Sequence, residues 1–211
     1  MDIADGLIQY LMLVSLLTFH EFAHAWTALK CGDDTARLQG RVSLNPIVHI
    51  DPIGTVFLPL LMIFMPGAGR YLIGWAKPVP FNYNNLGNPQ RDEVLIAMAG
   101  QAMNLLLGVA LVALVRVLQM FNSAEFVDLV LQAAVLSLLL CFFNLIPVPP
   151  LDGSHVLRVM TNMSQEAYAQ FARFGFIIII VLLQIPALRQ MLYDVTFGTL
   201  AVLARIFGVD L

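Results

Sequence analysis

The chain has 211 residues, of which 59% are hydrophobic and 12% are charged. An ordinary soluble domain carries about 25% charged residues, so this composition favours a single polytopic membrane domain over residues 1–211, without a separate soluble domain. The net charge of −3 and the lack of a basic run argue against a nucleic-acid partner and leave the lipid bilayer as the expected surrounding. The two cysteines, Cys31 and Cys141, predict neither a disulfide nor a metal-binding pair.

The first apolar stretch, about 7–30, follows the acidic residues Asp2 and Asp5. A secretory signal peptide would begin with basic residues and end in a small-residue cleavage site. We therefore expect this stretch to be retained as a membrane helix, for which about 20 predominantly apolar residues are enough.

This stretch contains the sequence Thr-Phe-His-Glu-Phe-Ala-His-Ala-Trp at 18–26. His20 and His24 are four residues apart, so on a helix both project from one face and can share a metal. Glu21 lies beside them, where a carboxylate can take a proton from a water that the metal has made acidic. An acidic group at mid-helix costs roughly 2.5–3.5 kcal/mol on insertion scales, which marks these residues as functional.

A structural alternative is a pair of core histidines bonded to backbone carbonyls, with Glu21 paired to one of them. In a soluble helix the two interpretations would be about equally probable, because the motif is short. The apolar surroundings favour the metal site here.

The next segments are shorter and richer in turn residues. Glycine, proline and asparagine mark 31–52 and 66–91 as loops, with short strands expected around 36–44. Between these loops, 53–65 is only about thirteen residues long, which is more typical of a re-entrant segment than of a spanning helix.

Four later stretches complete the predicted membrane domain. Apolar length predicts spanning helices at about 92–120 and 126–148, with two further candidates at 171–187 and 189–207. The fold class is therefore an all-α polytopic membrane protein of about five transmembrane helices, with a re-entrant segment and short β or loop elements.

A catalytic zinc usually takes three protein ligands and keeps one position open. The segment Asn-Leu-Ile-Pro-Val-Pro-Pro-Leu-Asp-Gly at 144–153 offers the third. Its prolines stop the helix, and unwound backbone at membrane depth requires surrounding protein or a wet cavity. We expect Asp152 to be presented there as a carboxylate ligand; the alternative is an ordinary Asp-Gly turn after a proline-rich helix exit.

Together with these motifs, three further segments resemble the site-2 proteases, intramembrane zinc metalloproteases, in the family's order. They are Gly-Arg-Val-Ser-Leu-Asn-Pro-Ile-Val-His-Ile-Asp-Pro-Ile-Gly at 40–54, Gly-Trp-Ala-Lys-Pro-Val-Pro at 74–80 and Ala-Gly-Gln-Ala-Met-Asn at 99–104. The resemblance covers roughly residues 10–155 and is to a compact form without appended soluble domains.

The resemblance implies one zinc ion held by His20, His24 and Asp152, with Glu21 as the catalytic glutamate. It also implies that Asn104 and Asn144 are polar residues near the site. The chain departs from the family at one position, because Gln101 follows the alanine-glycine pair where proline is common.

The asparagines and a third histidine have structural alternatives. Asn104 on an apolar helix can simply bond a neighbouring helix. Asn144 lies two turns before Asp152 and can steady the oxyanion of a tetrahedral intermediate. His49 more plausibly shapes its loop through bonds to backbone than binds the metal.

Helix parity and charge placement predict the topology. The histidines and Asp152 both lie toward the C-terminal ends of their helices, so they can meet only if these two helices run in the same direction across the membrane. This requires an even number of crossings between the starts of the two helices, and therefore that 53–65 does not cross. With the N-terminus outside, nine basic residues then lie on the cytoplasmic side, as the positive-inside rule requires. They are Lys30, Arg37, Arg41, Arg70, Lys77, Arg91, Arg158, Arg173 and Arg205. Only Arg116 and Arg189 fall toward the other face, so the zinc site is expected nearer the cytoplasm of a bacterial-type cell membrane.

The sequence thus predicts a zinc-dependent endopeptidase that acts on a single-span helix or a signal-peptide-like segment of a membrane protein. One alternative is a zinc-binding transporter, although its polar groups would be expected along a path across the bilayer rather than near one face. Another is a non-proteolytic scaffold that binds helices, against which the buried Glu21 argues. Substrate identity and oligomeric state do not follow from the sequence.

Overall fold

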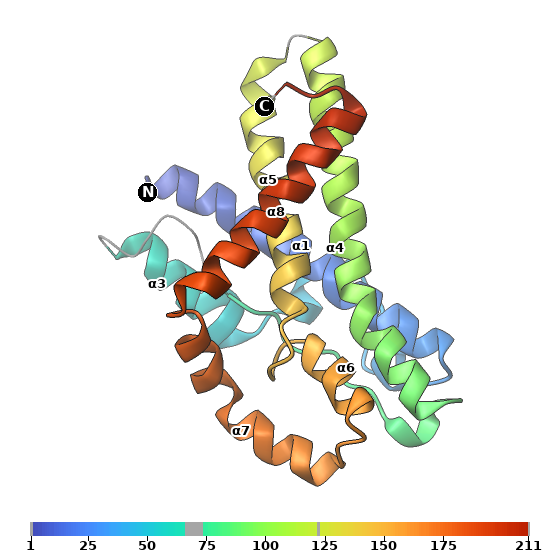
Figure 1. Ribbon diagram of the computed structural model, residues 1–211. Coiled ribbons are helices and arrows are strands. Elements are labelled where there is room, and N and C mark those ends of the chain that lie inside the picture. The colour runs from blue at the N-terminus through green and yellow to red at the C-terminus, as the bar shows by residue number, and fades with distance from the viewer. Residues whose placement is uncertain (1, 66–73, 122, 211) are drawn as a thin grey trace. The chain divides into compact units, whose positions relative to one another are not determined.

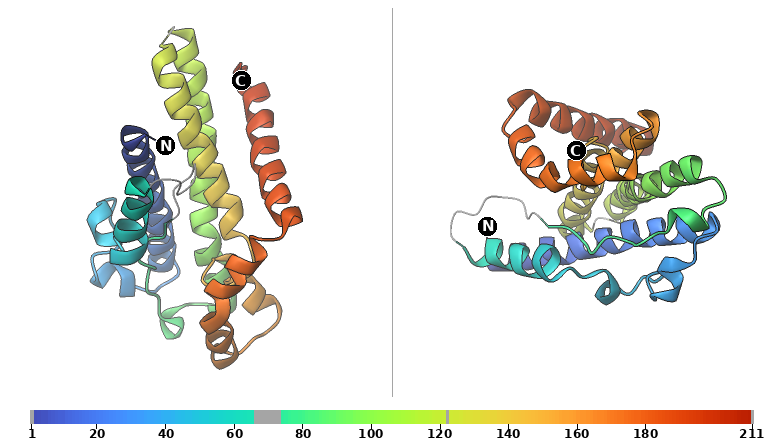
Figure 2. Two further views of the ribbon diagram at one scale, coloured as in Figure 1. Left: turned by 90° about the vertical axis from the view of Figure 1, so that its left-hand side faces the viewer. Right: turned by 90° about the horizontal axis from the view of Figure 1, so that it is seen from below.

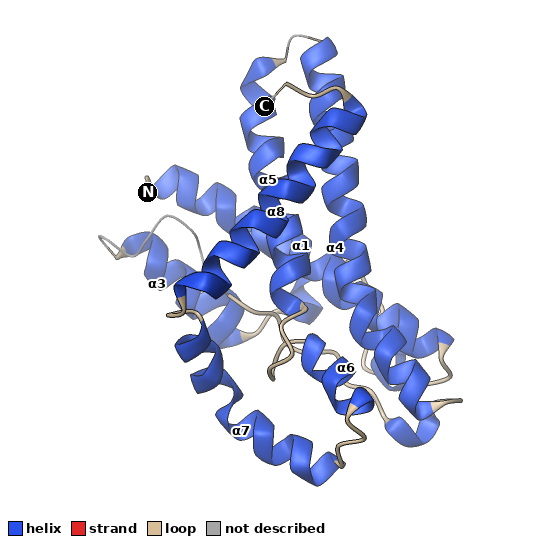
Figure 3. Ribbon diagram, in the orientation of Figure 1, coloured by secondary structure: helices blue, strands red, loops and turns tan. Residues whose placement is uncertain are grey.

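The computed structural model describes residues 2–65, 74–121 and 123–210, and these residues form helices joined by loops, with no strand among them (Figure 3). The all-α class is therefore confirmed. The chain divides into two compact units, Met1–Asp92 and Glu93–Leu211.

The first unit is built around α1 (Ile3–Lys30), against which α2 (Thr35–Leu38), η1 (Pro46–His49) and α3 (Leu58–Phe64) pack (Figure 1). Asp5 in the first turn of α1 and Lys30 in its last complement the helix dipole. Glycine follows at position 32 with a φ of 101°, a conformation that other residues rarely adopt.

The loops of the first unit are held by side chains that bond to backbone. The carboxylate of Asp33, fully buried, accepts hydrogen bonds from the backbone nitrogens of Thr35 and Asn82 at 3.1 and 2.7 Å. Asp51 caps the π-helical segment η2 (Pro52–Phe57) by accepting from the nitrogens of Ile53 and Gly54. A short 3₁₀ turn, η3 (Tyr83–Asn85), completes the unit.

In the second unit, α4 (Pro89–Met120, from Glu93 onward) and α5 (Ala124–Asn144) lie side by side, and α8 (Pro186–Phe207) packs along α5 (Figures 1 and 2). Their shared core comprises Val112, Val115, Ala134, Leu138, Leu200, Ala204 and Val209. Burial of this apolar seam holds the three helices together.

A second core surrounds the proline-rich segment after α5. Buried Ile146, Val148 and Leu151 from this segment pack with side chains of α7 (Gln165–Leu182) and α8. The short helix α6 (Gly153–Met160) follows directly. The segment is therefore fixed by packing and does not form a loose exit loop.

Among the residues that the structure describes, four helices are long and apolar enough to span a membrane: α1, α4, α5 from Glu125 onward, and α7. α8 is helical as predicted, but it contains Arg189, Asp194 and Arg205 and is not among these four. The apolar helical stretch Pro52–Phe64 is shorter, which agrees with the length expected of 53–65. Whether it crosses the bilayer stays a prediction.

The strands expected around 36–44 are wrong. Asp33 accepts hydrogen bonds from both the backbone nitrogen and the hydroxyl of Thr35, a turn that starts the helical residues of α2. Gly40, with a φ of 69°, then reverses the chain. Local side-chain bonds therefore replace strand pairing in this segment.

Candidate functional site

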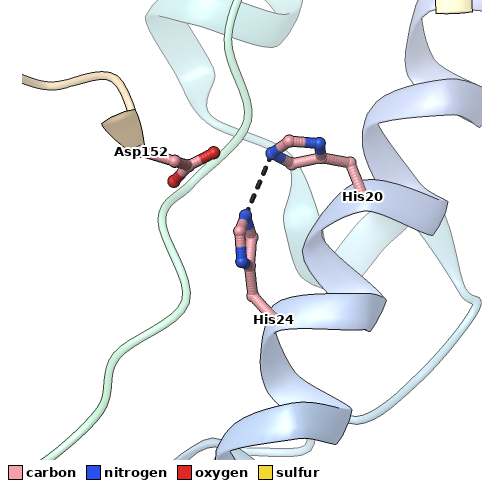
Figure 4. Close-up of side chains that lie close together, drawn as sticks. All are labelled: His20, His24 and Asp152. Atoms are coloured by element: carbon pink, nitrogen blue, oxygen red, sulfur yellow. Dashed lines mark hydrogen bonds between the residues drawn. The ribbon is translucent and has the colours of Figure 1, made fainter. Parts of the chain in front are cut away.

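The motif histidines lie on successive turns of α1, with their rings facing each other (Figure 4). Nε2 of His24 lies 3.0 Å from Nε2 of His20, and the ring planes meet at 83°. Both residues are buried, at 4% and 6% exposure. Spacing by four residues on a regular helix is what brings the two ring nitrogens together.

This arrangement fits a shared metal ion. Two imidazole nitrogens bound to one tetrahedral zinc at 2.0–2.1 Å lie roughly 3.3 Å apart. The observed separation of 3.0 Å therefore needs only a small opening of the pair.

Glu21 follows His20 directly and is 8% exposed. Within the same unit, the guanidinium of Arg41 is close enough for its charge to interact with that of Glu21. Arg41 is 3% exposed, and its Nη2 donates a hydrogen bond to the carbonyl of Lys77. Burial lowers the pKa of Arg41, while Glu21 opposes this shift. A buried cation thus lies near the carboxylate that the motif offers as a general base.

His49 is held by its own loop. Its Nε2 donates to the carbonyl of Ser43 at 2.8 Å, and burial lowers the pKa of its imidazole. The side chain of Asn45 accepts from the nitrogen of Ile47 in the same turn. These bonds agree with the loop-shaping interpretation of His49.

Asp152 belongs to the second unit, at the point where the proline-rich segment passes into α6. α5 ends at Asn144, as Pro147 requires, and Asp152 is the residue before the first turn of α6. Gly153 permits this connection, because a Cβ at that position would overlap the carbonyl of Leu145 and lie 2.8 Å from that of Ile146. The unwinding predicted from the prolines is confirmed.

One contact to Asp152 was not anticipated from the sequence. Nε2 of Gln101, on α4, donates a hydrogen bond to Oδ2 of Asp152 at 2.8 Å. The available signal was a polar glutamine on an otherwise apolar helix. Its partner is 51 residues away, so sequence alone could not identify it.

A buried polar network holds α6 within the second unit. Oε1 of Glu93 accepts from Nδ1 of His155 at 2.9 Å and from Nη1 of Arg158 at 3.1 Å. The hydroxyls of Ser154 and Tyr168 lie 2.8 Å apart. These bonds tie α6 to α4 and α7 and so fix the backbone beside Asp152. No local pattern in the sequence indicates that these residues form a network.

The two asparagines lie on different helices of the second unit. Asn104 on α4 is fully buried, and its backbone carbonyl accepts a hydrogen bond from the hydroxyl of Ser137 on α5 at 2.7 Å. The side-chain amide of Asn144 donates to the carbonyl of Leu140 on its own helix at 2.9 Å. Their roles in chemistry stay predictions.

Comparisons with known proteins agree with these features. The model of peptidase family M50 matches residues 8–128 and 118–184. "Putative zinc metalloprotease YwhC" of Bacillus subtilis is 37% identical over 194 residues, covering 86% of this chain and 83% of the relative.

"Putative zinc metalloprotease Rip2" of Mycolicibacterium smegmatis is 32% identical over 182 residues, covering 86% of this chain and 68% of the relative. Rip2 of Mycobacterium tuberculosis H37Rv is 30% identical over 191 residues, with 88% and 69% covered. No solved structure matches. The chain belongs to peptidase family M50, the site-2 protease family, and is a zinc metalloprotease with the helices of a multi-pass membrane protein.

Proposed function

We propose that this protease is an intramembrane endopeptidase that hydrolyses peptide bonds in or near transmembrane segments of membrane proteins. The observation that supports this most is the pair of imidazole nitrogens 3.0 Å apart inside an apolar helix. A zinc protease with a soluble substrate would have no need to place its ligands on a helix of this kind.

We assign the zinc to His20, His24 and Asp152. These side chains offer two imidazole nitrogens and one carboxylate oxygen, a donor set known from catalytic zinc sites. Zinc, when bound, polarises the carbonyl of the scissile peptide and lowers the pKa of a water molecule beside it.

Glu21 supplies the acid–base chemistry in this proposal. Its carboxylate accepts a proton from the attacking water and then delivers that proton to the nitrogen of the leaving amine. The guanidinium of Arg41 lies close enough for its charge to interact with that of Glu21. Asn144 and Asn104 are the proposed polar partners of the reacting carbonyl. Asn144 would have to exchange its bond to Leu140 for one to the developing oxyanion.

The substrate must unwind, because a helix shields its own peptide bonds. The segment 74–82 supports an extended mode of binding: it has no helical residue, and Lys77 and Trp75 donate backbone bonds to the carbonyls of His49 and Gly54 at 2.9 and 3.2 Å. Pro78 and Pro80 keep it from joining a regular sheet. We propose that an unwound substrate pairs with this backbone.

The site is proposed to lie nearer the cytoplasmic face of a bacterial-type cell membrane, with the N-terminus outside. The distribution of basic residues supports this orientation. Substrates would then be single-span helices or the remnants of signal peptides, as in regulated intramembrane proteolysis or remnant clearance.

The test is cleavage of a panel of single-span and signal-peptide-like substrates by the detergent-purified protein, with zinc and with a chelator. The Glu21→Gln protein controls for contaminating proteases. We expect zinc-dependent cuts within or beside the apolar segments. Cleavage confined to soluble peptides, or none with any membrane substrate, would contradict the proposal; the second result would favour a transporter or scaffold.

A further inference from the structure

We infer that Gln101 is a positioning residue that orients the Asp152 carboxylate for zinc. The inference rests on the proposed role of Asp152 as a ligand. It depends only on contacts within the second unit.

The side chains of Gln101 and Asp152 are in direct contact. Nε2 of Gln101 lies 2.8 Å from Oδ2 of Asp152, and Gln101 is 2% exposed. Gln101 sits in the middle of α4, a helix of 32 residues. A carboxylate has several lone pairs on its two oxygens, so accepting from an amide does not prevent it from binding a metal.

The carbonyl oxygen of the Gln101 side chain indicates that this residue does not serve to stabilise the fold. Oε1 of Gln101 is buried and accepts no hydrogen bond from the described residues. A buried carbonyl without a donor is unfavourable, and an apolar side chain of similar length would avoid it. What the glutamine adds at this position is the hydrogen bond to Asp152.

Other contacts in the second unit hold the backbone beside Asp152. The network of Glu93, His155 and Arg158 holds α6, and Gly153 allows its tight approach to the preceding segment. None of these contacts fixes the torsion of the carboxylate. The hydrogen bond from Gln101 reaches the carboxylate itself, from a different helix. Partners of this kind change metal affinity by roughly 10–100-fold when removed.

The test is zinc affinity of the full chain in detergent, measured by competition with a chelator. Gln101→Met keeps the length of the side chain and removes the donor. We expect zinc to bind roughly 10–100-fold more weakly, while the metal-free protein melts at the wild-type temperature. Gln119→Met is the matched control, since Gln119 lies on the same helix and donates to the backbone of Asp210; it should bind zinc like the wild type.

The Asp152→Ala protein separates this inference from the proposed function. If Asp152→Ala retains wild-type zinc affinity, the proposed ligand set fails. If Asp152→Ala loses affinity but Gln101→Met does not, only the positioning role fails. Adding Gln101→Met to Asp152→Ala should weaken the residual binding no further. An equal further loss, or a lower melting temperature of metal-free Gln101→Met with unchanged affinity, would assign Gln101 to the scaffold.

Discussion

The four histidines of the chain form two groups that differ in the partners of their rings. His49 donates to a backbone carbonyl, and His155 bonds to Glu93 in the other unit. His20 and His24 instead face each other across 3.0 Å. The two ring nitrogens are therefore near enough to bind one metal ion.

Glu21 is the residue hardest to explain without chemistry. A carboxylate within an apolar helix costs roughly 2.5–3.5 kcal/mol on insertion. Arg41 lies close enough to offset part of this cost. A scaffold could avoid the cost with an apolar residue, whereas a hydrolase needs a base at this position.

At the scale of elements, the turn from the proline-rich segment into α6 depends on Gly153. A methyl group there would overlap the carbonyl of Leu145. We expect Gly153→Ala to destabilise the protein by roughly 1–3 kcal/mol through overpacking and to lower its zinc content, because Asp152 is the neighbouring residue. Thermal unfolding in detergent and metal analysis measure both effects.

Gly198→Ala is the matched control for this change. Gly198 lies within α8, and a Cβ there meets no atom within 4 Å. Alanine in this helix should stabilise the protein by up to about 1 kcal/mol and leave zinc content unchanged. Equal behaviour of the two alanine variants would mean that the turn before α6 does not depend on glycine.

The elements show which features the sequence could predict. The long helices followed from apolar length. The ends of two of them were predicted too late, because α5 stops at Asn144 rather than 148 and α7 at Leu182 rather than 187. Their starts were predicted too late, because polar caps extend them: Ser164 accepts from the nitrogen of Ala167 at the start of α7, and Asn88 accepts from that of Arg91 near the start of α4. The strand predicted at 36–44 does not form, because Asp33 accepts hydrogen bonds from Thr35 that favour a turn.

For the site, the sequence could predict the residues whose spacing is local. His20, Glu21 and His24 lie within one helix, and the prolines mark the segment before Asp152. Gln101, Glu93 and Arg158 could not be identified, because each acts through a partner more than 50 residues away. Such pairs are fixed by tertiary packing and leave no periodic signal.

At the scale of the whole molecule, the topology follows from helix parity and charge. In a Cys31→Ser, Cys141→Ser background, single cysteines at Asp34, Asn84 and Thr161 should react in intact cells only with reagents that enter the cytoplasm. Cysteines at Asp2 and Ser123 should react from outside. If Asp34 and Asn84 label from opposite sides, then 53–65 crosses the membrane and the parallel arrangement of the helices must be rebuilt.

Hydrolysis by Glu21 on a zinc held by histidines is tested most directly by measuring zinc content and cleavage on the same preparations. Glu21→Gln keeps the shape of the side chain but cannot accept a proton at neutral pH. We expect it to retain one zinc per chain and lose cleavage, while His24→Ala loses both. Cleavage retained by Glu21→Gln would contradict the mechanism, and zinc lost from it would make Glu21 a ligand.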